Sequence, residues 1–207
     1  MSTADERWWV IVMDRRAHED RECSMIEMAL RRPGVRVCVV DRQTVSAIET
    51  ALEEAIARQG RLDGVVVVQR LTGAGTGELE ACDAGLWDEA VVRPLRETFK
   101  ATRAAVDAFL GEGTAGRLVH VLLGARESAR LAGDDDLPFA TLVDGVLALV
   151  RSTAREYGRR GIACNLVVAG HGVGSLDTEV STAVGFFASE DSAFVTGEVL
   201  RAGTSSR

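Results

Sequence analysis

The stretch from Phe139 to Asn165 constrains the fold of this chain more than any other. Its apolar side chains recur three and four residues apart, which predicts one long helix with a wide buried face. The apolar positions are Leu142, Val143, Val146, Leu147, Leu149 and Val150. Gly158 and Gly161 are typical stop signals for this helix. The apolar run from Ile162 to Ala169 then predicts a strand of a parallel sheet that is covered on both faces.

The rest of the chain repeats this alternation of apolar strands and amphipathic helices, which predicts an α/β domain. Apolar runs predict strands at 7–13, 35–40 and 61–68, and helices at 20–32 and 45–59. The strands at 116–123 and 193–200 and the helices at 86–110 and 182–190 are implied by the family resemblance described below. The length of 207 residues fits one domain over 1–207. We expect residues 1–6 and 204–207 to be flexible tails.

The net charge and the spacing of the cysteines restrict the partners and the cellular location that we expect for the protein. A net charge of -7 argues against general nucleic-acid binding. No apolar run reaches the roughly 18 residues of a membrane span, and the polar, acidic N-terminus lacks a secretory pattern. We therefore expect a cytoplasmic protein with no membrane partner. The cysteines form no C-x-x-C pair and are expected to be buried free thiols. They are Cys23, Cys38, Cys82 and Cys164.

Four stretches resemble short-chain dehydrogenase/reductases, in particular the ketoacyl reductase-like branch. They are Leu62–Gly64, Trp87–Asp88, Arg151–Asn165 and Ala188–Leu200. The resemblance implies a Rossmann-like doubly wound parallel sheet in a single domain. It also equates the run that begins at Val37 with the third strand of the family, so about one strand-helix unit is expected to be missing before Leu62. The substrate lid is expected to be cut to a short link after Ala169.

The same resemblance locates the family's catalytic groups, and this chain departs from each of them. Phe139 and Val143 stand where the family has its tyrosine acid and the lysine that holds the cofactor ribose. Leu123 replaces the catalytic serine, and Pro94 replaces the asparagine of the proton relay. The glycine-rich phosphate turn is replaced by Asp14–Asp20. We therefore expect no catalytic residues, no bound cofactor and no metal site.

Several residues offer weaker alternatives. Ser128 could be a displaced catalytic serine, but His120 is expected to be a packed or edge histidine. His171 has no evident partner. The glycine-rich run 71–77 is expected to be a surface connection, and the acidic run 134–136 a solvated loop. Arg15, Arg16 and Asp41 are the residues of the early part of the chain that could contact a dinucleotide.

Three functions remain open from the sequence. The first is a catalytically silent subunit that joins an active reductase of the same family and stabilises or shapes it. The second is a diverged NAD(P)H-dependent ketone or ketoacyl reductase, and the third is a homodimeric binding protein for a small ligand. In the family the two long helices, here predicted at 86–110 and 139–158, form the interface with a neighbour. The predicted interface residues are Phe99, Arg103, Val106, Leu110, Val146, Leu149, Val150, Thr153 and Tyr157.

Overall fold

A computed structural model of the chain describes residues 7–13, 21–31, 35–41, 45–70, 80, 82–124, 137–169 and 176–202. The predicted tails, the segment 14–20, the glycine-rich run 71–77, the acidic run 134–136, Ser128 and His171 lie outside the described residues. The predictions for those positions remain predictions.

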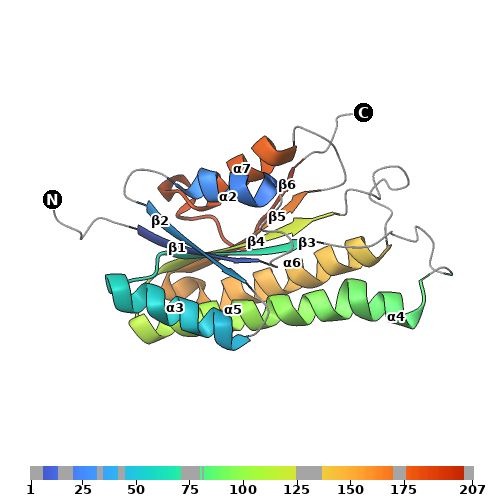
Figure 1. The fold of residues 1–207 in the computed structure, drawn as a ribbon, viewed down its shortest axis with the longest axis horizontal. Helices are drawn as coiled ribbons and strands as arrows, with labels where there is room; N and C mark the ends of the chain where they lie inside the picture. The colour runs from blue at the N-terminus through green and yellow to red at the C-terminus, as the bar shows by residue number, and fades with distance from the viewer. Residues whose placement is uncertain are drawn as a thin grey trace.

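The described part of the chain is built around one parallel sheet of six strands (Figure 1). The strands are β1 (Arg7–Met13), β2 (Val35–Asp41), β3 (Gly64–Arg70), β4 (Gly116–Leu123), β5 (Ile162–Ala169) and β6 (Val199–Ala202). Their order across the sheet is β2-β1-β3-β4-β5-β6. Every neighbouring pair is parallel, and the sheet is therefore the doubly wound, Rossmann-like arrangement that the sequence predicts.

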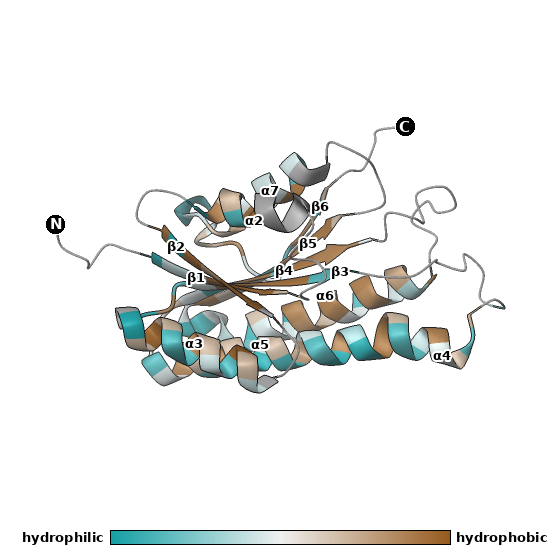
Figure 2. Cartoon of the chain, viewed as in Figure 1, coloured by the Kyte–Doolittle hydropathy of each residue, from teal (hydrophilic) through white to brown (hydrophobic). Residues whose placement is uncertain are grey.

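Helices cover both faces of the sheet (Figure 1). The helices are α2 (Arg21–Leu30), α3 (Val45–Gln59), α4 (Ala84–Trp87), α5 (Arg93–Glu112), α6 (Leu137–Tyr157) and α7 (Leu176–Phe187), with short turns η3 (Asp88–Val92), η5 (Gly158–Arg160) and η6 (Glu190–Ser192). α3, α5 and α6 pack on one face, and α2 and α7 pack on the other. Figure 2 shows the strands as predominantly hydrophobic, as expected of a sheet covered on both sides.

Asp63 joins three strands at the amino-terminal edge of the sheet. Its carboxylate accepts a hydrogen bond from the Trp8 N–H at 2.8 Å, and its own N–H donates to the Trp8 carbonyl at 2.9 Å. The Asp63 carbonyl accepts from the Arg117 N–H at 3.0 Å. The Leu62–Gly64 motif therefore fixes where β1, β3 and β4 begin.

The predicted truncation agrees with the sheet order. β2 pairs directly with β1 and forms the edge of the sheet, so no described strand lies between them or beyond β2. Residues 170–175 link β5 to α7. Two strands and one helix were predicted with the wrong bounds. The strand predicted at 61–68 covers Gly64–Arg70, and the helix predicted at 182–190 covers Leu176–Phe187. The last strand covers only Val199–Ala202, because the residues before it form turns instead.

Pro94 changes the long helix that the sequence predicts at 86–110. The structure has α4, a π-helical turn at η3, and then α5, with Pro94 buried in the first turn of α5. A proline at this point lacks an N–H that an uninterrupted α-helix would use, and the π turn absorbs the change. The far end of α5 is capped by Gly113 in the left-handed conformation, as expected of glycine.

Among the described helices, the segment Leu137–Arg160 is long and apolar enough by length and composition to span a membrane. Its apolar stripe is buried against the sheet, since Leu142, Val146 and Val150 are all 0% exposed. The hydrophobicity of α6 is therefore accounted for by the core.

Candidate functional site

The candidate site lies at the carboxyl edge of the sheet, where ligands bind in open α/β folds. The register of β3, β4, β5 and β6 places Arg70, Leu123, Ala169 and Ala202 side by side in one row. Leu123 is 4% exposed and Ala169 is 3% exposed. The middle of this row is therefore closed and apolar.

The two helical positions of the site are apolar and buried as well. Phe139 and Val143 lie one turn apart in the first half of α6, at 7% and 2% exposure, and both belong to the core between the sheet and α3, α5 and α6. Pro94 is buried at the start of α5. The structure thus places Leu123, Phe139, Val143 and Pro94 in packed positions, where none of them offers a proton donor.

Polar side chains at the ends of β3, β4 and β5 come from two described residues, Gln69 and Arg70. Gln69 is 6% exposed, and its amide donates to the Arg70 carbonyl at 3.1 Å. A backbone hydrogen bond joins the ends of β4 and β5, because the Gly124 N–H donates to the Ala169 carbonyl at 3.0 Å. Among the described residues at the ends of these strands, Arg70 and Gln69 are the polar side chains, and Leu123 and Ala169 are apolar.

His120 is packed inside the protein, in agreement with the sequence prediction. It is 1% exposed, and its Nε2 lies 3.3 Å from the Thr102 hydroxyl of α5. That hydroxyl donates to the Thr98 carbonyl at 2.7 Å, so it is left to accept from Nε2–H. Burial lowers the pKa of His120 to about 4, and Nδ1 has no hydrogen-bond partner. His120 is therefore a neutral core residue, away from the carboxyl edge.

Of the cysteines and the remaining candidate ligands, the cysteines are less buried than the sequence predicts. Cys164 is buried, but Cys38 and Cys82 are partly exposed, so the prediction of buried thiols is wrong for these two. Only the backbone of Asp41 is described. Within the described residues no group of three or more His, Cys, Asp or Glu side chains could hold a metal ion.

The structure divides the predicted interface residues into two groups. Four of them lie in the core of the protomer, at 5% exposure or less, and cannot contribute a free surface. They are Val106, Val146, Val150 and Thr153. The others, Phe99, Arg103, Leu110, Leu149 and Tyr157, are exposed or partly exposed on α5 and α6. Phe99 is 52% exposed, and the prediction of an interface now rests on this second group.

Asn165 has a structural role that its sequence context did not reveal. It is 2% exposed in β5. Its amide donates to the Val195 carbonyl at 2.9 Å and its side-chain oxygen accepts from the Glu198 N–H at 3.1 Å. It holds the turn before β6 against the sheet. An asparagine inside an otherwise apolar strand is the sequence signal for such a buried polar contact.

Comparisons with known proteins agree with this architecture. A family described as enoyl-(acyl carrier protein) reductase matches residues 2–173. The BbsD subunit of (2S)-[(R)-hydroxy(phenyl)methyl]succinyl-CoA dehydrogenase from Thauera aromatica is 27% identical, and the match covers 92% of this chain and 83% of that protein. An A-factor type gamma-butyrolactone 1'-reductase from Streptomyces virginiae is 28% identical, over 78% of this chain and 61% of that protein.

Solved structures match over nearly the whole chain. A variant of actinorhodin polyketide ketoreductase with NADPH superimposes with a TM-score of 0.71 at 17% identity, covering 97% of each chain. A short chain dehydrogenase from Mycobacterium smegmatis gives a TM-score of 0.69 at 20% identity, covering 100% of this chain and 96% of that one. At these identities the likeness is one of fold.

Proposed function

Because this chain belongs to the short-chain dehydrogenase/reductase family, we propose that it is a catalytically silent subunit that assembles with an active reductase of the same family and stabilises or shapes it. The observation that carries the proposal is that the side chains at the candidate site are apolar. Leu123, Phe139 and Val143 are all buried and apolar. At these three described positions no side chain donates a proton or carries a charge, so they cannot stabilise charge that develops on a substrate oxygen.

The same residues argue against a bound nicotinamide cofactor. By the family pattern, Val143 stands where the ribose would be held and Phe139 where the acid would stand. Neither side chain can donate or accept a hydrogen bond, and both pack into the core. The described residues therefore do not fit the sugar and nicotinamide part of a dinucleotide, and we derive no reaction through it.

The surface of α5 and α6 supports the assembly half of the proposal. The two helices approach closely, since a Cβ on Gly145 of α6 would lie 3.1 Å from the Leu95 side chain of α5. Phe99 projects from α5 with half of its surface exposed, and Leu110 and Leu149 are partly exposed. A large exposed aromatic residue on a rigid helix pair is a typical anchor for a protein partner.

The Thauera relative adds support, because it is itself named as a subunit of a dehydrogenase. Assembly from more than one polypeptide is therefore known for a protein that resembles this chain over most of its length. We infer that the partner here is a reductase with an intact catalytic set.

Co-expression with active reductases of the family tests the proposal. We expect the two chains to co-purify, and Phe99→Asp to abolish the complex. Met28→Asp is the matched control, because Met28 is 61% exposed on α2, on the opposite face of the sheet. A chain that ignores every such reductase and forms a stable particle alone would contradict the proposal.

The second candidate function is a diverged reductase, and the comparisons favour it to the extent that the relatives described above are named as dehydrogenases or reductases. It requires that Arg70 and Gln69, with residues outside the described part, bind NAD(P)H. Direct titration with the cofactor separates the two candidates.

A further inference from the structure

No described strand pairs with the outer side of β2, which we call the β2 edge. β2 is the last strand in the sheet order, and among the described strands it pairs only with β1, in an unbroken register from Arg7–Val35 to Met13–Asp41. Val35, Val37, Cys38, Val39 and Val40 are partly exposed. Natural edges are usually protected by charged side chains, proline or a bulge. Between its two ends this strand has Arg36 as its one charged residue, and it has no proline and no bulge.

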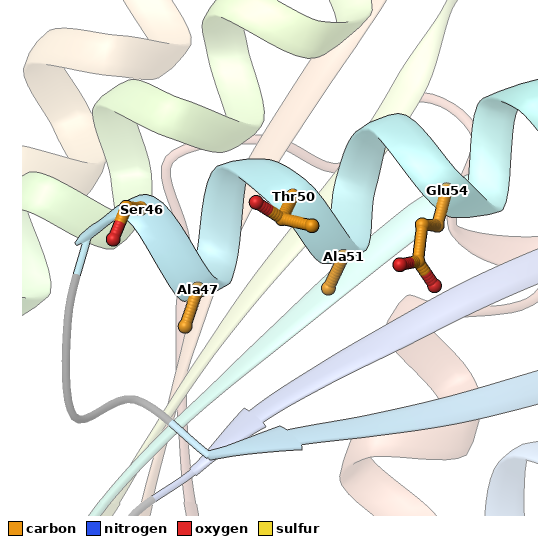
Figure 3. A pocket seen from close by; sticks show the side chains of 5 residues that line it. All are labelled: Ser46, Ala47, Thr50, Ala51 and Glu54. Atoms are coloured by element: carbon orange, nitrogen blue, oxygen red, sulfur yellow. The ribbon is translucent and has the colours of Figure 1, made fainter.

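A hollow of about 360 Å³ lies beside α3, lined by Ser46, Ala47, Thr50, Ala51 and Glu54 (Figure 3). Ala47, Ala51, Glu54 and Arg58 follow the spacing of one helical stripe, which we call the α3 stripe. It flanks the buried positions Ile48, Leu52 and Ala55.

The charged end of the α3 stripe lies close to β2. Burial raises the pKa of the Cys38 thiol, and the charges of Arg58 and Glu54 act on the same thiol in opposite directions. α3 also contacts both β1 and β2. The stripe and the β2 edge are therefore parts of one surface.

We propose that this surface binds a second copy of the chain. β2 pairs antiparallel with β2 of the second copy about a two-fold axis perpendicular to the sheet, and the two α3 helices pack against each other across the junction. The register centred on Cys38 pairs all seven residues of the strand. It sets Val37 opposite Val39 of the second copy and brings no like charges face to face.

The helix spacing fits this arrangement. α3 contacts both β1 and β2, so it sits over the space between them. Two such helices across a new strand pair would be about two strand spacings apart, roughly 10 Å, which is near the usual distance between packed helices. An uninterrupted sheet would then continue through both copies.

The α3 stripe is complementary to itself, which favours a second copy over an unrelated partner. When two stripes run antiparallel, Ala47 and Ala51 of one copy face Arg58 and Glu54 of the other. The small residues leave room for the long ones. Glu54 and Arg58 already neutralise each other at 3.1 Å within each copy, so no unpaired charge is buried.

Sedimentation of the purified chain with substitutions on α3 tests the proposal. We expect the wild-type chain to dimerise, and Ala51→Arg to weaken dimerisation roughly tenfold or more. Ala57→Arg is the matched control, because Ala57 is exposed on the side of α3 opposite the buried positions Ile48, Leu52 and Ala55, and it should leave the dimer intact. A monomeric wild type, or a dimer that survives Ala51→Arg, would overturn the proposal.

Oxidation with diamide gives a second readout that does not depend on a helix substitution. Cα atoms opposite each other in an antiparallel pair are about 4.5–5.5 Å apart, within the range that a disulfide spans. Diamide should therefore link two chains through Cys38. Cys38→Ser should remove the link and Cys82→Ser should retain it. A wild-type chain that does not cross-link would contradict the pairing.

This proposal does not rest on the proposed function. Phe99→Asp tests the reductase partner and should leave β2 pairing unchanged, while Ala51→Arg should leave the reductase partner bound. The failure of one proposal is thus distinguishable from the failure of the other.

Discussion

Leu123 at the end of β4 is paired in register with Ala169 at the end of β5, and both are nearly fully buried. In a doubly wound sheet this is the edge where a ligand would be expected. Here the two residues continue the hydrophobic core to the end of the strands. Phe139 and Val143 belong to the core on the other face of the sheet, so on both faces the candidate positions are part of the packing that stabilises the fold.

Restoring a charge at the site should cost stability and yield no activity. Val143 is 2% exposed, so Val143→Lys would bury an ammonium group without a partner and should cost about 3 kcal/mol or more. Val143→Ile adds one methylene and should cost about 1 kcal/mol. Urea unfolding of both variants checks the difference. A Val143→Lys protein as stable as the wild type would show that this position opens to solvent.

Gly116 should tolerate no side chain, because a Cβ there would overlap the ring of Phe109. We expect Gly116→Ala to destabilise the protein by about 1–3 kcal/mol through overpacking. Gly111→Ala is the control, since a Cβ at Gly111 meets nothing within 4 Å, and alanine should slightly stabilise α5. Equal thermal shifts for the two variants would contradict the packing of α5 on β4.

His120 should make the fold sensitive to mild acid. Its pKa is about 4 in the folded protein against an ordinary 6.5, because burial disfavours the charged ring. The stability that this histidine contributes is therefore complete above pH 6.5 and is lost as the pH falls through about 4. The loss should reach roughly 3 kcal/mol.

Denaturant unfolding from pH 7 to pH 4 checks this for the wild type and His120→Gln. Carboxylates titrate equally in both proteins, so the difference between the curves isolates the histidine. The wild type should lose more stability than the variant. Parallel curves would mean that the ring is already solvated in the native state.

Asn165 should be a large stability determinant. Asn165→Ala would leave the Val195 carbonyl and the Glu198 N–H without their side-chain partner, which we expect to cost about 2–4 kcal/mol. Ser189→Ala removes an exposed hydroxyl that donates to the Phe186 carbonyl at 2.8 Å and should cost less than about 0.5 kcal/mol. Hydrogen exchange of residues 195–200 would show whether the turn before β6 loosens in Asn165→Ala alone.

Much of the fold could be predicted from periodicity. The pattern of apolar residues located β1, α3 and β5 with the bounds that the structure has, and α6 nearly so. The family resemblance placed the last strand at 193–200, but long-range hydrogen bonds to Asn165 and Cys164 hold the first part of this run as a turn. Such contacts leave no periodic signal.

From the sequence, the candidate site could be predicted only as a set of positions at which this chain lacks the residues of the family. The resemblance named Pro94, Leu123, Phe139 and Val143, but burial decides that these residues complete a core. Burial also decides which helix residues can form an interface. Val146, Leu149 and Val150 are all apolar. Val146 and Val150 lie on the buried face of the helix and Leu149 does not.

Calorimetric titration of the purified chain with NADPH and NADH tests the central claim most directly, with an active reductase of the family as the positive control. Because hydrocarbon fills the positions beside Phe139 and Val143, we predict no binding at millimolar cofactor concentrations. A dissociation constant in the micromolar range would contradict the account, because the chain would then bind the cofactor that we propose it does not bind.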